Sequence, residues 1–305
     1  MTHVLDQWVT PHWTLYNADC IEVARALPAA SVHLTVTSPP FSNLYTYSDS
    51  EADLGNSADD DEFFAHFGFL IGELFRATIP GRLCAVHCKQ LVDYAGSAGE
   101  AGLRDFRGDI IRAFQARGWK YHSEVTIWTD APREMQKTKA NGLLYKTIRR
   151  DASFCRQGLA EYLIVFRRWP KTEAEAALCR PVTHTEEDFP LPTWQRYASP
   201  VWFDVDPERC LNVRIARDNA DEKHLCPFSL DVVERAVHLW SNPGEVVFDP
   251  FAGVGTTLYQ SVLLGRKGLG AELKPAYAAQ AAKYLARAVA ESQRPTLFDL
   301  AAVGE

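Results

Sequence analysis

An apolar segment that ends in an acid and a glycine-rich turn is the clearest chemical signal in the sequence. The run Val246-Val247-Phe248-Asp249 has the pattern of a buried strand, and the turn 250–257 leads from it into a segment suited to a helix. Glycine lets the backbone approach a ligand closely, and the first N–H groups of the helix then face that ligand. The stretch therefore predicts a nucleotide-binding turn between a strand and a helix.

A second short strand pattern, Lys267-Gly268-Leu269-Gly270-Ala271-Glu272, ends in a carboxylate about twenty residues after the turn. That spacing is typical of an acid that binds ribose hydroxyls in a nucleotide-binding βαβ unit. The third glycine of the dinucleotide fingerprint is absent, because Leu258 stands in its place. The pattern favours a small adenosine ligand over a pyrophosphate cofactor, with a turn that serves only packing as the alternative.

A proline pair follows another apolar strand pattern near the N-terminus. Residues 32–37 run directly into Ser38, Pro39, Pro40 and Phe41. Two prolines fix the backbone and remove two N–H donors, so carbonyl groups are left beside a hydroxyl and an aromatic ring. Such a site can accept hydrogen bonds from an exocyclic amino group and stack the ring that carries it. Taken alone, however, the motif favours a proline pair that simply ends a strand.

The charge of the chain is unevenly distributed. The whole sequence carries a net charge of −7, yet the segment from Arg133 to Lys171 carries +7 and the remainder carries −14. A basic band on an acidic body is typical of a protein that grips phosphate groups with one face. Charge alone leaves a solvated charged surface as an equal alternative.

The seven cysteines are scattered and odd in number, which suits a reducing compartment. Cys84, His87 and Cys88 lie close together but lack a second pair of ligands, so we expect buried thiols and no metal site. No apolar run approaches the length of a membrane span, and the N-terminus lacks a charged-then-apolar signal pattern. The sequence therefore predicts a soluble, cytoplasmic protein with no membrane partner.

Strand and helix patterns alternate along the chain, which predicts an α/β protein with a mostly parallel sheet and helices on both faces. Strands are expected at 13–16, 32–37, 83–87, 121–128, 162–166, 246–249 and 267–272, and helices at 21–27, 64–78, 109–117, 228–241, 258–264 and 275–290. Pro80-Gly81 is expected to end the second helix. Scattered prolines and aromatic residues mark 171–222 as an irregular recognition insertion. It would divide a catalytic domain into residues 1–170 and 223–305.

Two motifs together resemble those of the β-class amino-directed DNA methyltransferases. Thr37-Ser38-Pro39-Pro40-Phe41 is similar to the catalytic motif of that family, and residues 248–257 are similar to its cofactor motif. The catalytic motif comes first in the chain, which is the β-class order. Three shorter segments add to the resemblance, namely 17–19, 222–228 and 270–273. The resemblance implies a Rossmann-like, S-adenosylmethionine-dependent methyltransferase fold for most of the chain outside the insertion.

The resemblance also assigns roles around S-adenosylmethionine as the cofactor. Glu272 would hold the ribose hydroxyls and Asp19 the adenine end, while Thr256 and Thr257 would cap a helix and line the methionine end. The other expected cofactor-binding residues are Asp249, Pro250, Phe251, Ala252, Gly253 and Gly255. The reaction requires no metal.

The target base would be received by Ser38, Pro39, Pro40 and Phe41. In this family a serine before Pro-Pro usually accompanies methylation of cytosine N4, whereas Asp or Asn usually accompanies adenine N6. Ser38 therefore favours cytosine N4. Adenine N6, an RNA or small-molecule substrate, and a catalytically silent DNA-binding module stay open as alternatives.

Double-stranded DNA is the partner that the resemblance and the basic segment both imply. The target base would leave the duplex, because a base inside the stack cannot reach the methyl donor. The other bases of the target site would be read from within 171–220. The family allows a homodimer and a partner restriction endonuclease. Phosphate contacts are expected from Lys137, Lys139, Lys146, Arg149 and Arg150.

Overall fold

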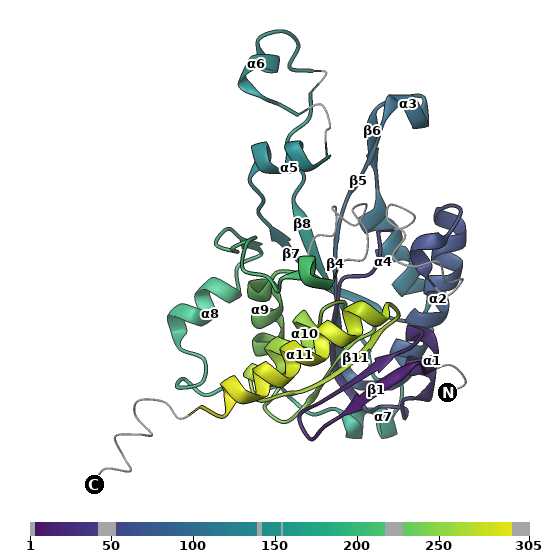
Figure 1. The fold of residues 1–305 in the computed structure, drawn as a ribbon, viewed down its shortest axis with the longest axis vertical. Helices are drawn as coiled ribbons and strands as arrows, with labels where there is room; N and C mark the ends of the chain where they lie inside the picture. Colours follow the sequence, from purple (N-terminus) through teal and green to yellow (C-terminus); the bar gives the residue numbers. More distant parts are fainter. Residues whose placement is uncertain (1–3, 42–52, 139–141, 154, 217–227, 295–305) are drawn as a thin grey trace.

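A sheet of nine strands organises the protein (Figure 1). The computed structural model describes residues 4–41, 53–138, 142–153, 155–216 and 228–294. Five adjacent strands are parallel, in the order β2, β11, β10, β3 and β4, whereas β1 and β8 run antiparallel to their neighbours. This confirms the mostly parallel sheet. In sheet order the strands are β1 (Asp6–Val9), β2 (Trp13–Asn17), β11 (Lys267–Glu272), β10 (Val246–Asp249), β3 (Val32–Thr37), β4 (Thr78–Lys89), β8 (Glu161–Arg167), β7 (Lys120–Ile127) and β9 (Val201–Trp202).

Helices cover both faces of the sheet, because alternate strand residues point to opposite sides. On β8, Ile164 and Phe166 pack with the helices of one face, and Leu163 and Val165 pack with α9 on the other. A separate apolar cluster joins β2 to α10 and α11. The first face carries α1 (Cys20–Ala26), α2 (Asp60–Ala77) and α4 (Phe106–Ala116); the second carries α9 (Leu230–Trp240), α10 (Thr256–Leu263) and α11 (Pro275–Ser292).

Parallel pairing brings the two sequence motifs to the same edge of the sheet. Strands β3 and β10 are neighbours, with Phe248 opposite Thr35, so both end at the same level. Ser38 therefore emerges beside the turn that follows Asp249. Strand β11 ends on the far side of β10, which places Glu272 at this edge as well. The carboxyl ends of parallel strands are where open α/β sheets bind their ligands.

Two excursions extend the molecule beyond this edge (Figure 1). One is the antiparallel pair β5 (Leu91–Asp93) and β6 (Gly102–Arg104), joined by α3 (Ala95–Ala98). The other, residues 128–160, lies between β7 and β8 and is named here the β7–β8 excursion. Its helices are α5 (Ala131–Thr138) and α6 (Tyr145–Ile148).

The expected helix stop at Pro80-Gly81 is wrong. Helix α2 ends at Ala77, and the proline and glycine lie inside β4. Here the pairing of β3 with β4 shifts register, between Val32 opposite Thr78 and Leu34 opposite Leu83. A strand irregularity suits both residue types, because proline cannot donate to the ladder and Gly81 adopts a φ of 85°.

Residues 171–222, expected as an irregular insertion, contain regular elements in their described part. These are α7 (Glu173–Leu178), α8 (Leu191–Tyr197) and the 3-10 turn η3 (Val213–Ala216), together with β9, which pairs with β7. Helix α7 packs near the start of β4, where a Cβ on Gly81 would lie 2.7 Å from Cys179 Sγ. That is the edge opposite the two motifs. Within the described residues, each helix is too short or too polar to cross a bilayer.

Candidate active site

The turn after β10 is held against β3 by the carboxylate of Asp249. Thr37 Oγ1 donates a hydrogen bond of 2.7 Å to Asp249 Oδ1, and the N–H of Phe251 donates another of 3.0 Å. Burial raises the pKa of Asp249 to about 6, although these donors favour its ionised form. Thr257 Oγ1 donates to the carbonyl of Val36 at 3.2 Å, so the start of α10 is also attached to β3.

Gly255 allows α10 to begin immediately after the turn. Its φ is 90°, a left-handed conformation, and a Cβ there would lie 3.1 Å from the Cβ of Ala281 on α11. The position therefore needs both the positive φ and the absence of a side chain. Gly253 has a φ of 54° and meets no such neighbour, so only its backbone conformation favours glycine.

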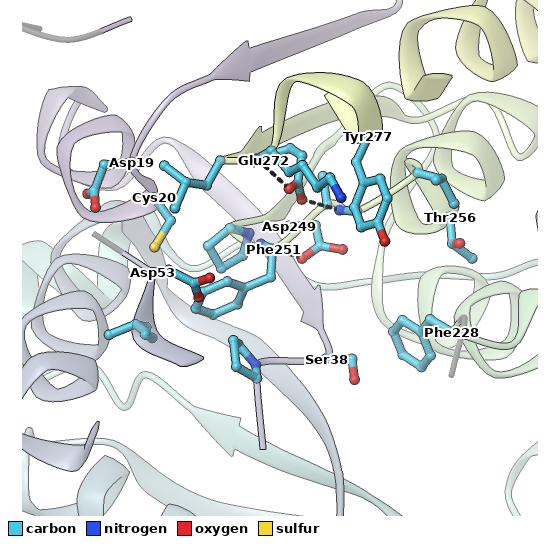
Figure 2. A pocket seen from close by; sticks show the side chains of 18 of the residues that line it. Asp19, Cys20, Ser38, Asp53, Phe228, Asp249, Phe251, Thr256, Glu272 and Tyr277 are labelled. Atoms are coloured by element: carbon cyan, nitrogen blue, oxygen red, sulfur yellow. Dashed lines mark hydrogen bonds between the residues drawn. The ribbon is translucent and has the colours of Figure 1, made fainter. Parts of the chain in front are cut away.

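Glu272 links the end of β11 to the glycine turn. Its Oε2 accepts the N–H of Gly253 at 2.8 Å, and its Oε1 accepts the N–H of Lys274 at 2.8 Å (dashed in Figure 2). Burial, with a smaller contribution from the charges of Asp249 and Asp53, raises the pKa of Glu272 to about 7 although the two backbone donors lower it. The carboxylate is thus short of stabilising donors, and a ligand with hydroxyl groups could supply them.

A cavity of about 150 Å³ opens between these elements (Figure 2). In this view Asp19 and Thr256 lie on opposite sides, with Phe251 and Glu272 between them. Pro39, Phe41, Gly255 and Thr257 lie outside the lining. The expected residues that line the cavity are Asp19, Ser38, Pro40, Asp249, Pro250, Phe251, Ala252, Gly253, Thr256 and Glu272.

Several residues of the cavity wall were not predicted from the sequence. Asp53 caps the short turn η2 (Leu54–Asn56) and adds a further carboxylate to the lining. Lys274 lies with its Nζ 4.7 Å from the ring centre of Tyr277, and both line the cavity. Phe228 is the last residue of the resembling segment 222–228, of which 222–227 lie outside the described residues, and the resemblance gave it no role in the cavity. Asp53, Lys274 and Tyr277 stand at no spacing that would have identified them.

Ser38 takes part in a hydrogen-bonded chain that the sequence also did not reveal. Ser38 Oγ lies 3.0 Å from His87 Nδ1, and His87 Nε2 lies 3.0 Å from Glu161 Oε2. The His87 ring stacks on Phe228, with 5.0 Å between ring centres and 25° between planes. The Phe41 ring is tilted by 51° to the His87 ring, at 6.3 Å between ring centres. In the sequence His87 stands out only through its neighbours Cys84 and Cys88, whose thiols are buried in the core with raised pKa values.

A model of a DNA methylase family, covering enzymes directed at N6 or N4, matches residues 32–283 of the chain. The chain belongs to this DNA methylase family. Its members are amino-directed, S-adenosylmethionine-dependent DNA methyltransferases, which confirms the resemblance and the fold that it implied.

Individual relatives of this DNA methylase align over most of its length. The type II methyltransferase M.XycI of Xanthomonas campestris pv. cyanopsidis is 26% identical over 286 residues, which are 89% of this chain and 87% of the relative. TTHA0409 of Thermus thermophilus, a putative DNA modification methylase, was solved in complex with S-adenosyl-L-methionine. It is 25% identical in sequence with a TM-score of 0.65, and the alignment covers 91% of this chain and 96% of TTHA0409. The cytosine-N4-specific PvuII DNA methyltransferase has the same fold, at 16% identity and a TM-score of 0.61, and the alignment covers 95% of this chain and 96% of that enzyme.

The basic band of this DNA methylase is divided between two edges of the sheet. Lys146, Arg149 and Arg150 are exposed on the β7–β8 excursion, at the edge that carries the cavity. Arg168 follows β8 at the opposite edge, where it pairs with Glu175 at 2.8 Å. A single basic face is therefore not formed. Lys139 and the side chain of Lys137 lie outside the described residues.

Proposed function

We propose that the chain binds S-adenosylmethionine in this cavity and transfers its methyl group to the exocyclic amino nitrogen of a flipped-out DNA base, cytosine N4 being favoured. One observation carries the proposal: Ser38 and Pro40 of the acceptor motif line the same cavity as Glu272 and the glycine turn. Acceptor and donor would therefore meet without a large rearrangement, and positioning supplies much of the rate enhancement in such transfers.

The charged residues that line the cavity fit the cofactor. Four carboxylates line it, from Asp19, Asp53, Asp249 and Glu272, against one lysine, so the cavity favours a cationic ligand. Glu272 would accept hydrogen bonds from ribose hydroxyls, which compensates for its burial. S-adenosylmethionine supplies an activated methyl group when bound.

The remaining cofactor contacts follow the family resemblance, except that Gly255 and Thr257, which were expected in the cofactor pocket, lie outside the lining of the cavity. Asp19 would bind the adenine end through its second oxygen, since Oδ1 already accepts the N–H groups of Ile21 and Glu22 at 2.7 and 2.9 Å. Thr256 would line the methionine end. Pro250, Phe251 and the residues up to Gly253 would form the wall between them, and Gly255 and Thr257 would support that wall from outside the lining.

The acceptor motif would raise the reactivity of the amino nitrogen. That nitrogen is a poor nucleophile while its lone pair is delocalised into the base. Hydrogen bonds from its protons to Ser38 Oγ and the Pro39 carbonyl would favour a tetrahedral nitrogen with its lone pair directed at the methyl group. Stacking on Phe41 would contribute about 1–3 kcal/mol, which offsets the cost of a few kcal/mol for extruding the base.

Cytosine N4 is favoured because serine precedes the two prolines, as in the cytosine-directed members of the family. Adenine N6 is the alternative product. Lys146, Arg149 and Arg150 would bind phosphates, since they are exposed at the edge of the sheet from which the base must enter.

The test is to incubate the protein with S-adenosylmethionine and unmethylated genomic DNA, digest the DNA to nucleosides and identify the product by mass spectrometry. N4-methylcytosine is the expected product. N6-methyladenine would keep the cavity and the reaction but contradict the assignment from Ser38. Cofactor binding with no methylated base would contradict DNA methylation, and the same assay with RNA would then test the remaining substrate class.

A further inference from the structure

His87 and Glu161, which extend the hydrogen-bonded chain behind Ser38, have no part in the proposed reaction. The hydrogen-bonded chain is assembled from three neighbouring strands: Ser38 follows β3, His87 lies in β4, and Glu161 begins β8. His87 is only 8% exposed, and its two nitrogens each lie 3.0 Å from one partner. Phe228 covers the face of its ring. The imidazole is thus fixed in one orientation between a hydroxyl and a carboxylate.

This arrangement determines where the protons lie when His87 is neutral. A carboxylate can only accept hydrogen bonds, so His87 Nε2 carries the proton and donates it to Glu161 Oε2. His87 Nδ1 is then an acceptor, and the Ser38 hydroxyl donates to it. The hydroxyl proton therefore points away from the substrate. Both lone pairs of Ser38 Oγ are left for an incoming N–H group.

We propose that Ser38, His87 and Glu161 form a proton relay that removes the surplus proton from the amino nitrogen as it is methylated. The inference rests on the proposed function, because it requires an amino group at Ser38. Ser38 would be the catalytic residue. His87 and Glu161 would be positioning residues that act through it.

The proton balance is complete within the three residues. The nitrogen that has gained a methyl group breaks one N–H bond, and the electron pair of that bond returns to nitrogen. The proton passes to Ser38 Oγ while the hydroxyl proton of Ser38 passes to His87 Nδ1. The net change is one proton gained by His87, whose imidazolium is stabilised by the Glu161 carboxylate. Positioned bases of this kind typically contribute about 10²- to 10⁴-fold to a rate.

A second cavity, of about 110 Å³, gives the proton a way out. His87, Glu161 and Phe228 all line it, and Phe228 also lines the first cavity. The other charged residues that face it are Lys89, Asp130, Arg133 and Glu134. Two of these are engaged in other pairs, Arg133 with Glu208 at 3.4 Å and Glu134 with Arg156 at 3.6 Å. Of these carboxylates, Glu161 is the one hydrogen-bonded to His87 and so acts most directly on its protonation.

The pH profile of methyl transfer tests the relay. Single-turnover rates at saturating cofactor and DNA should rise with pH and level off, because only neutral His87 can accept the proton. Glu161→Gln keeps the shape of the side chain but removes the charge that stabilises the imidazolium. The midpoint of its profile should move to lower pH, and its plateau should fall about tenfold. His87→Asn should reduce the plateau rate about 100-fold, and its pH profile should show no midpoint.

Controls separate the relay from a structural effect. His122→Asn removes an exposed histidine on β7, the strand next to β8, and its rate and pH profile should equal those of the wild type. Each variant should also bind S-adenosylmethionine with wild-type affinity, which shows that the cavity is intact. If Glu161→Gln and His87→Asn lose rate but keep the wild-type midpoint, His87 only supports the fold and the relay is overturned.

A measurement without substrate distinguishes failure of the relay from failure of the proposed function. ¹⁵N NMR of the free protein should show neutral His87 as the tautomer protonated at Nε2. The opposite tautomer would overturn the relay even if DNA is methylated. A wild-type protein with the expected tautomer that methylates no DNA would instead contradict the proposed function.

Discussion

The cofactor side and the acceptor side of the cavity are built in opposite ways. On the cofactor side, Glu272 accepts the N–H of Gly253, 19 residues earlier in the same βαβ unit. On the acceptor side, Ser38 meets His87 across 49 residues, and His87 meets Glu161 across 74. The first side is held mainly by backbone donors and a tight turn, the second by side chains from three strands. Variants of the first should therefore change binding, and variants of the second should change rate.

The largest effect should come from Gly255→Val on the cofactor side. Valine at a φ of 90° is strained, and its Cβ would approach Ala281 to 3.1 Å, so the turn must move. We expect at least a 100-fold loss of S-adenosylmethionine affinity by calorimetry, about 3 kcal/mol. Gly265→Val is the matched control, since Gly265 has a φ of 74° but no atom within 4 Å of its Cβ position. Similar losses of affinity in both variants would mean that backbone strain alone is responsible.

Ser38→Ala should produce the next largest effect, on the other side of the comparison. Loss of the hydroxyl removes both the acceptor for the amino proton and the first step of the relay. Turnover should fall about 100-fold while cofactor affinity stays within about twofold of the wild type. Ser31→Ala, just before the start of the same strand, removes a hydroxyl that donates only to the Pro28 carbonyl and should change neither quantity. Equal loss of rate and cofactor affinity would make Ser38 a structural residue.

Glu272→Gln should lower cofactor affinity about tenfold, because it replaces a charged acceptor of ribose hydroxyls with a neutral one. Since the pKa of Glu272 is raised to about 7, wild-type affinity should increase as the pH rises from 6 to 8. The variant should lack this increase. Glu291→Gln, near the end of α11, replaces a carboxylate that bonds Tyr259 and Arg287 and does not line the cavity, so this variant should keep the increase. A pH dependence that survives in Glu272→Gln would assign the titration to another group.

Cofactor affinity should increase with pH, whereas the stability of the cofactor-free protein that depends on Glu272 should decrease. A carboxyl group whose folded pKa lies above its unfolded value holds its proton more tightly in the folded state. The stability associated with Glu272 should therefore be complete below the unfolded pKa and decline as the pH rises through about 7. The difference in melting temperature between wild type and Glu272→Gln, followed from pH 4 to pH 8, measures this contribution. A difference independent of pH would contradict it.

The smallest effect on the chemistry should come from the basic residues. Replacing Lys146, Arg149 and Arg150 with alanine should weaken DNA binding and reduce the slope of log affinity against log salt by about 2.7, or about 0.9 for each lost phosphate contact. Cofactor affinity and the rate at saturating DNA should hardly change. Lys171→Ala, at the opposite edge of the sheet, is the control. An equal effect of Lys171→Ala on the salt slope would place the DNA on a different face.

Patterns in short stretches of sequence predicted much of the secondary structure. They failed where the structure depends on how strands pair in the sheet. Strand β3 was predicted at its observed bounds, because alternating apolar residues show its period of two. The helix stop at Pro80-Gly81 was wrong, since only the sheet shows that this pair occupies a shift in register within β4. The basic segment was found as a run of charge. Its division between two edges follows from the antiparallel direction of β8.

The sequence by itself determined the α/β class, the two motifs and the family, because each is written in residues that lie close together in the chain. It also indicated Glu272, since a βαβ unit of standard length returns the chain to the neighbouring strand. Only the tertiary structure decided that Ser38 and the glycine turn share one cavity, that Asp53 and Phe228 complete its wall, and that His87 and Glu161 stand behind the serine. Contacts between distant strands depend on strand order and register, and no spacing along the chain encodes either of these.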